Sequence, residues 1–232
     1  MRQFPVMVFA AGLGTRMGEM TRRQPKPLIV VAGRSLLDHA LDLTEAVGLT
    51  RRVVNLHYLG EQIAVHLTGR DIALSWERGA ILETGGGLRA ALPLLGEGPV
   101  YTLNSDAVWT GRNPLQELAE AWDDARMDAL LLLAPPERAE GHVGRGDFLF
   151  ESDGRIARAR GLAGLVYLGA QIIRTEALAE IDVPVFSVNR LWDRMIARGR
   201  AFGLVHDGGW CDVGRPEGIA TAEAMLARSG DG

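Results

Sequence analysis

Near its N-terminus the chain carries a glycine-rich run, AAGLGTRM (residues 10–17), whose residue types suit the binding of phosphate. The glycines let backbone amide groups approach an anion closely, and a guanidinium can hold phosphate through two parallel hydrogen bonds. The run lacks the third glycine of a dinucleotide fingerprint and the Gly-Lys-Ser/Thr ending of a Walker loop. We therefore predict a phosphate site of another type, formed by Ala10, Ala11, Gly12, Gly14, Thr15 and Arg16.

Of the 25 lysine and arginine residues only one is a lysine, and this residue, Lys26, stands between Pro25 and Pro27. The two prolines favour an extended local backbone, which aims the side chain. A compact ammonium on a flexible stem can follow a phosphate whose geometry changes during a reaction. The alternative is a solvated loop lysine, but the position favours a second phosphate contact.

Two aspartates, Asp106 and Asp212, follow segments that read as strands, TLN (residues 102–104) and GGWC (residues 208–211). Each could simply cap a turn or a helix. Hard divalent ions, however, prefer oxygen ligands and commonly bridge one or two carboxylates to substrate phosphates. The pair is therefore the candidate Mg²⁺ site of this sequence.

The elements that must position these residues alternate in the first half of the chain. Periodicity predicts strands over residues 4–10, 51–56, 72–76, 100–104 and 128–134, and helices over 35–48, 60–67, 86–95 and 113–122. Helical crossovers of this length favour an α/β fold with a doubly wound, mostly parallel sheet. Ligands of such sheets collect at the carboxyl ends of the strands, where the glycine-rich run and Asp106 both lie.

The second half of the chain has a different pattern. Alternating runs on both sides of SDG (residues 152–154) predict a β-hairpin within residues 144–161, and residues 165–173 read as a further strand. Two helices, over residues 187–199 and 216–226, flank a strand-like segment over residues 201–214. This half therefore adds a small β-rich insertion to the sheet.

Composition excludes several function classes. With 232 residues, 47% hydrophobic content and a formal net charge of −4, the chain can bury a core but offers no general attraction to nucleic acid or an anionic membrane. It has one cysteine and no long apolar span, so the cytoplasm is the expected location. The histidines have no metal-ligand spacing, and the tryptophans Trp109, Trp122 and Trp192 are expected in the core.

The run AAGLGTRM followed by PKPL (residues 25–28) resembles the signature of the sugar nucleotidyltransferases, also called nucleoside-diphosphate-sugar pyrophosphorylases. The resemblance covers nearly the whole chain. The segments ETGGG (83–87), NSD (104–106), GRGDF (144–148) and WCDVG (210–214) are most similar to the branch of uridylyltransferases that act on N-acetylmuramic acid 1-phosphate in peptidoglycan recycling.

The resemblance implies a single Rossmann-like domain, similar to glycosyltransferase A, over residues 1–232, with a nucleotide-binding part over about 1–134 and a sugar-binding part over about 135–232. It implies an enzyme that couples a sugar 1-phosphate to a nucleoside triphosphate, with Arg16, Lys26, Asp106 and Asp212 as catalytic residues and Mg²⁺ on the two aspartates. Further implied contacts are Glu83, Thr84, Gly85 and Asn104 for the nucleotide, and Gly146, Asp147, Tyr167 and Gly169 for the sugar.

Other functions stay open at this point. The chain could be a mannose-1-phosphate guanylyltransferase or another hexose 1-phosphate nucleotidyltransferase, or a non-catalytic nucleotide-sensing subunit. A dinucleotide-dependent dehydrogenase is disfavoured by the missing third glycine. The expected partners are small-molecule substrates only, and the chain is expected to be a monomer or a dimer.

Overall fold

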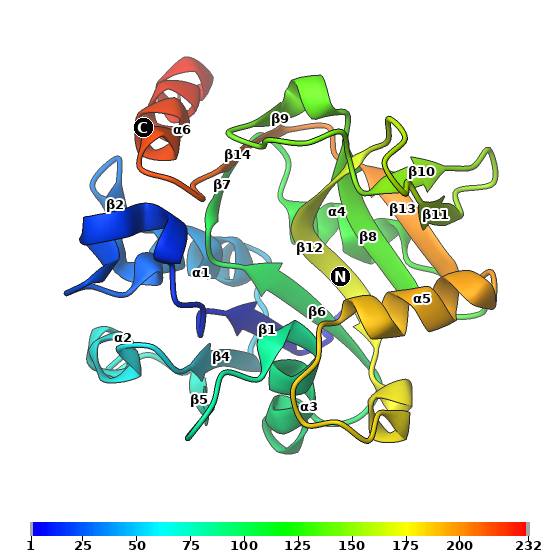
Figure 1. Ribbon diagram of the computed structural model, residues 1–232, viewed down its shortest axis with the longest axis horizontal. Helices are drawn as coiled ribbons and strands as arrows, with labels where there is room; N and C mark the ends of the chain where they lie inside the picture. The colour runs from blue at the N-terminus through cyan, green and yellow to red at the C-terminus, as the bar shows by residue number, and fades with distance from the viewer. Residues whose placement is uncertain (1, 231–232) are drawn as a thin grey trace.

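The computed structural model describes residues 2–230, and its centre is a seven-stranded sheet with the order β13-β8-β12-β6-β1-β4-β5 (Figure 1). The strands are β1 (Val6–Phe9), β4 (Arg52–Leu56), β5 (Ala73–Trp76), β6 (Pro99–Asn104), β8 (Ala129–Ala134), β12 (Val166–Arg174) and β13 (Ala201–Val205). β1 pairs in parallel with both β4 and β6, and β8 pairs in parallel with β13. The predicted α/β class with a mostly parallel sheet is confirmed.

One strand runs against the others. β12 is antiparallel to both of its neighbours, β6 and β8. Its register shifts between Tyr167 and Gln171, where Gly169 has a φ of +85°. A Cβ atom at Gly169 would lie 2.8 Å from Asn104 Nδ2, so the absence of a side chain lets the bulge pack against the end of β6.

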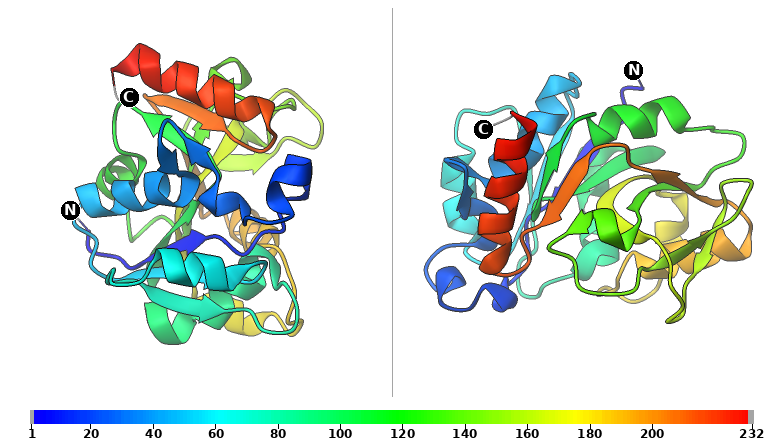
Figure 2. Two further views of the ribbon diagram at one scale, coloured as in Figure 1. Left: turned by 90° about the vertical axis from the view of Figure 1, so that its left-hand side faces the viewer. Right: turned by 90° about the horizontal axis from the view of Figure 1, so that it is seen from above.

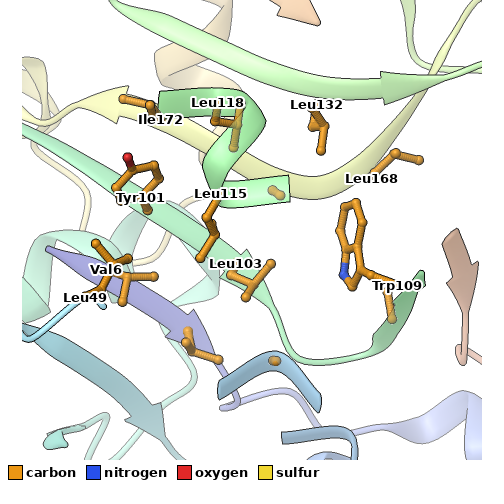
Figure 3. Packing of buried hydrophobic residues seen from close by; sticks show 14 of the residues in the cluster. Val6, Leu49, Tyr101, Leu103, Trp109, Leu115, Leu118, Leu132, Leu168 and Ile172 are labelled. Atoms are coloured by element: carbon orange, nitrogen blue, oxygen red, sulfur yellow. The ribbon is translucent and has the colours of Figure 1, made fainter. Parts of the chain in front are cut away.

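Helices cover both faces of this sheet because successive strand residues point to opposite sides. Val6 and Val8 share one core with residues of α1 (Leu36–Ala46), α2 (Gly60–His66) and α4 (Pro114–Ala121). Met7 faces the second core, which includes residues of α3 (Glu83–Leu95) and α5 (Asn189–Ala197). Figure 3 shows the first core, where side chains of the helix α4 meet those of several strands.

A smaller sheet with the order β7-β14-β9 carries one of the candidate metal ligands. It consists of β7 (Ala107–Thr110), β14 (Gly209–Asp212) and β9 (Ala139–Glu140). The helix α6 (Glu217–Ser229) lies beside β14, as Figure 2 shows, and packs against a third core that includes Cys211 and Val213. Asp212 is thus the last residue of a strand held in place by a helix.

Three shorter features complete the chain. The predicted hairpin is present as β10 (Phe148–Phe150) and β11 (Ile156–Arg158), and a second small hairpin joins β2 (Val30–Val31) to β3 (Arg34–Ser35). Short 3-10 helices span Thr15–Thr21, Lys26–Leu28, Pro136–Arg138 and Glu176–Glu180.

The two parts of the chain that the sequence distinguishes both contribute strands to the main sheet. Within residues 2–230 no helix is long and apolar enough to cross a membrane.

Candidate active site

The glycine-rich run leaves β1 at its carboxyl end and forms one wall of a pocket. Ala10, Ala11 and Gly12 line this pocket together with Lys26 and Asp106. We call it the first pocket. The N–H of Ala10 donates to the Oδ1 atom of Asn55 (2.7 Å), so a contact between Ala10 and phosphate would not use this amide.

The later residues of the run serve a different surface. Gly14 has a φ of +63°, and a Cβ atom there would lie 2.9 Å from the Cβ atom of Lys26, so a glycine is needed for the loop to pack on the lysine stem. Thr15 begins a 3-10 helix. Arg16 is exposed and lines a neighbouring open pocket together with Arg215. Glu19 and Glu217 line the same open pocket, so it contains charged groups of both signs.

The ammonium group of Lys26 reaches the first candidate metal ligand. Lys26 is only 8% exposed, and its Nζ atom donates to Asp106 Oδ2 (2.8 Å). Asp106 is held at the end of β6 by its neighbour Ser105, whose N–H and hydroxyl both donate to the Phe9 carbonyl. The serine therefore ties the end of β6 to the end of β1.

Asp212 comes to the same place from the small sheet. The N–H of Val213 donates to the Asp106 carbonyl (2.9 Å), so the segments that carry the two aspartates lie side by side. A Cβ atom at Gly214 would lie 2.5 Å from Asp212 Oδ2 and 3.1 Å from Arg16 Nη1, which places the Arg16 guanidinium beside this carboxyl group. The structure thus brings Arg16, Lys26, Asp106 and Asp212 together from four separate segments.

The electrostatics of Asp212 are those of a carboxyl group held close to another one. Burial raises the pKa of Asp212, and the negative charge of Asp106 raises it further, while Lys26, Arg16 and His142 lower it only in part. His142 is a member of this cluster that the sequence reasoning left out. A divalent cation between the two carboxylates would relieve this repulsion.

The residues present fit Mg²⁺. Asp106 and Asp212 offer hard oxygen donors, and the pKa of Asp212 is shifted by burial and nearby charges rather than by hydrogen bonds. Among residues 2–230, no cluster of three or more His, Cys, Asp or Glu side chains surrounds a possible metal position. A metal held here would therefore complete its coordination with water and substrate phosphate oxygens, as Mg²⁺ commonly does.

A buried polar pair, Asn55 and Glu77, lines the first pocket and was not predicted from the sequence. Both residues are 3% exposed, and Asn55 Nδ2 donates to Glu77 Oε1 (2.6 Å). The second oxygen of Glu77 accepts from the N–H of Leu82 (2.8 Å). The pair therefore links the glycine-rich run, through Ala10, to the segment that precedes Glu83. The sequence could have indicated this pair, because Asn55 and Glu77 lie at the carboxyl ends of β4 and β5, where ligands of such sheets bind.

Asn55→Ala is expected to destabilise the protein and to raise the KM for the nucleoside triphosphate that the resemblance implies as a substrate. The variant leaves the N–H of Ala10 and an oxygen of Glu77 without their partner, at a cost of about 1–3 kcal/mol for each buried group. Urea unfolding and initial-rate kinetics measure the two effects. A variant with unchanged stability would show that this network does not hold the loop.

The helix α3 begins at Glu83, three residues before the predicted start at residue 86, so it includes all three glycines of residues 85–87. A Cβ atom would lie 2.4 Å from the Phe186 ring at Gly85, 2.4 Å from the Pro184 carbonyl oxygen at Gly86, and 2.6 Å from Glu77 Oε1 at Gly87. Close packing at the start of the helix explains why all three positions are occupied by glycine. Glu83 and Thr84 line the first pocket, whereas Gly85 packs on Phe186 and donates its N–H to the Phe186 carbonyl.

Gly86→Ala is expected to lower the free energy of unfolding by about 1–3 kcal/mol, the usual cost of forcing an extra methyl group into a packed site. The clash is with a backbone oxygen, which cannot rotate away. Gly12→Ala is the control for this stability measurement, because a Cβ atom at Gly12 would meet no atom within 4 Å. Equal stability of the two variants in urea would contradict the packing argument.

A second pocket adjoins the first, and Phe9, Thr84 and Asn104 line both. Asp147 and Tyr167, two of the residues expected to contact the sugar, are in its wall, and Asp147 Oδ2 accepts from the N–H of Tyr167 (2.9 Å). Gly146 and Gly169 do not line it: a Cβ atom at Gly146 would lie 2.2 Å from the Gly164 carbonyl oxygen, and Gly169 packs on Asn104.

The three tryptophans expected in the core, Trp109, Trp122 and Trp192, are all buried. Trp192 also lines the second pocket, a position that was not predicted from the sequence. Its Nε1 atom donates to Gln171 Oε1 (2.8 Å), and its ring meets that of Tyr167 edge to face. The second pocket therefore has a rigid aromatic wall.

Comparisons with known proteins agree with this geometry. Residues 6–195 match the MobA-like NTP transferase domain. The chain is 42% identical to an N-acetylmuramate alpha-1-phosphate uridylyltransferase of Caulobacter vibrioides, over 96% of this chain and 97% of the relative. It is 32% identical to a protein of the same name from Neisseria meningitidis, over 94% of this chain and 96% of the relative.

Solved structures share the fold. The crystal structure of HddC from Yersinia pseudotuberculosis superposes with a TM-score of 0.75 at 19% identity, covering 96% of this chain and 99% of that chain. A structure from Bacillus anthracis superposes with a TM-score of 0.78 at 16% identity, covering 97% and 95% of the two chains.

Proposed function

The chain belongs to the family of MobA-like NTP transferase domains, and from this premise we propose that it joins UTP to N-acetylmuramic acid 1-phosphate, with release of pyrophosphate. The similarity to the two near full-length relatives reported above shows a sugar-1-phosphate nucleotidyltransferase, and the choice of UTP and of this sugar is our proposal from the name of those relatives. The observation that carries the proposal is the contact between Lys26 and Asp106, beside Asp212, in the wall of the first pocket.

The reaction needs alignment and charge compensation more than covalent help from the protein. An oxygen of the sugar 1-phosphate attacks the α-phosphorus of UTP, the bond from that phosphorus to the bridging oxygen of the β-phosphate breaks, and pyrophosphate leaves. The attacking phosphate is already ionised at neutral pH, so no general base is required. The main obstacle is the repulsion between two anions.

The side chains divide this work. The Lys26 ammonium offsets the negative charge of the reacting phosphates, and Arg16 with Arg215 retains the leaving pyrophosphate in the adjoining open pocket. Asp106 and Asp212 would hold Mg²⁺, which when bound supplies further charge compensation to the phosphates. Glu83 and Thr84 in the wall of the first pocket are in position to contact the base, and the second pocket would take the sugar.

A substrate panel tests the proposal. The protein is incubated with Mg²⁺, one of UTP, GTP, CTP or dTTP, and one of N-acetylmuramic acid, N-acetylglucosamine, glucose or mannose 1-phosphate, and pyrophosphate is measured. We expect the highest kcat/KM for UTP with N-acetylmuramic acid 1-phosphate. A preference for GTP with mannose 1-phosphate would assign another substrate pair, and no pyrophosphate from any pair would leave a nucleotide-sensing role.

A further inference from the structure

The second pocket contains a cation that nothing in the reaction described so far uses. Its charged side chains are Asp147 and Arg158, and the remaining lining residues are aromatic, polar or aliphatic. The phosphate-binding cations Lys26 and Arg16 do not line it. A guanidinium here must therefore have a structural role or meet a second anionic group on the sugar.

The Arg158 side chain is fixed in one orientation. Its guanidinium carbon lies 5.0 Å from the centre of the Phe148 ring and 5.4 Å from that of Trp192. Its Nε atom donates to Asp193 Oδ1 (2.8 Å), and its Nη2 atom donates to the Asn189 carbonyl (3.2 Å). Because these contacts hold the planar group in advance, little side-chain entropy remains to be lost when a ligand binds.

The same contacts leave donor capacity unused. Within residues 2–230, the Nη1 atom of Arg158 donates to no protein acceptor, although the side chain is only 24% exposed. Its ion-pair partner Asp193 is 61% exposed, so the negative charge of that partner is largely screened by water. Arg158 therefore keeps both a free donor atom and much of its attraction for an anion in the pocket.

We propose that Arg158 binds a carboxylate carried by the sugar, and that it thereby selects N-acetylmuramic acid 1-phosphate over N-acetylglucosamine 1-phosphate. The inference rests on the proposed function. The two sugars differ by a lactyl ether, which adds one carboxylate to the first of them. A guanidinium recognises a carboxylate through charge-assisted hydrogen bonds, and a pocket that presents it discriminates against a ligand without that anion.

The opposite charge of Asp147 fits the same assignment. A carboxyl oxygen of Asp147 that is not engaged by the N–H of Tyr167 can accept hydrogen bonds from sugar hydroxyl or amide groups. The sugar would then have an acceptor at one side and a cation at the other. The rival role for Arg158 is to hold the 1-phosphate of every sugar substrate, but that phosphate must lie beside Lys26, Asp106 and Asp212 for reaction.

The test compares Arg158→Met with Arg194→Met on the two sugar 1-phosphates, with UTP held at saturation. Arg194 lies in α5, pairs with Glu180 and does not line the pocket, so its substitution changes the net charge equally. We expect Arg158→Met to lower kcat/KM for N-acetylmuramic acid 1-phosphate about 10- to 150-fold, the range for a lost charged hydrogen bond. With N-acetylglucosamine 1-phosphate, the kcat/KM of Arg158→Met should stay within about 3-fold of that of the unsubstituted protein. For N-acetylmuramic acid 1-phosphate, the kcat/KM of Arg158→Lys should lie between those of Arg158→Met and the unsubstituted protein.

Two results would overturn the inference. An equal loss for both sugars would mean that Arg158 holds the 1-phosphate or the fold of the pocket, and no loss for either would mean that it binds neither. Calorimetric binding of the two sugar 1-phosphates is measured in parallel, with and without the substitution. If the protein released no pyrophosphate with any sugar, the proposed function would fail, while the binding comparison would still decide the role of Arg158.

Discussion

Lys26→Met should slow turnover by about 10²-fold or more while the protein stays folded. The methionine preserves the packing of the buried stem against Gly14, and it removes only the ammonium that lies 2.8 Å from Asp106. In the mechanism proposed above, the transition state then loses a largely buried charge that offsets two phosphates, and such a charge has a larger effect there than in water. Single-turnover rates with UTP and the sugar 1-phosphate measure this loss apart from any change in binding.

Lys26→Arg is the companion variant. It keeps the positive charge but replaces a compact head by a planar one, so it should recover only part of the rate. Far-ultraviolet circular dichroism and urea unfolding establish that both variants are folded. Wild-type turnover in folded Lys26→Met would show that the lysine acts only as a partner for Asp106.

Asp212→Asn is expected to lower the rate about as much as Lys26→Met does. It should not lower the free energy of unfolding, and it could raise it. The amide is a poorer ligand for Mg²⁺, so turnover should fall about 10²-fold or more, and the Mg²⁺ concentration needed for half-maximal rate should rise. In the absence of divalent ions the variant should be at least as stable as the parent. Burial and Asp106 raise the pKa of Asp212, which means that folding disfavours its charged form at neutral pH.

Asp207→Asn is the matched control, because Asp207 precedes the same strand, β14, and its side chain is exposed. It should change neither the rate nor the Mg²⁺ requirement. If Asp212→Asn lost stability together with activity, the carboxylate would be a structural group and its assignment as a metal ligand would be wrong.

The order of helices and strands could largely be predicted from the sequence, because hydrophobic periodicity and capping residues are local patterns. Helices such as α1 have a clear apolar period and a capping residue, Ser35, whose Oγ atom accepts the Asp38 N–H. The position of Asp106 at the carboxyl end of a buried strand followed from the rule for ligands of open α/β sheets. That Asp212 lies beside it required the resemblance to a known family, because no local pattern places β14 next to β7.

Other features depend on contacts between distant segments and were therefore not predictable from local patterns. The N–H of Ala10 is engaged by Asn55, and the glycines of α3 are required by Phe186 and Pro184, which follow them by about a hundred positions in the chain. Arg158 reads in the sequence as one of many arginines on a hairpin. Only the packed structure shows that it stands over two aromatic rings in the second pocket.

The most direct test of the central claim, attack by a sugar 1-phosphate on the α-phosphorus at the Lys26 and Asp106 cluster, is to follow labelled phosphate. UTP labelled at the α-phosphorus should transfer its label to the nucleotide sugar, whereas UTP labelled at the γ-phosphorus should release it in pyrophosphate. Appearance of the γ-label on the sugar, or release of inorganic phosphate in place of pyrophosphate, would contradict this account.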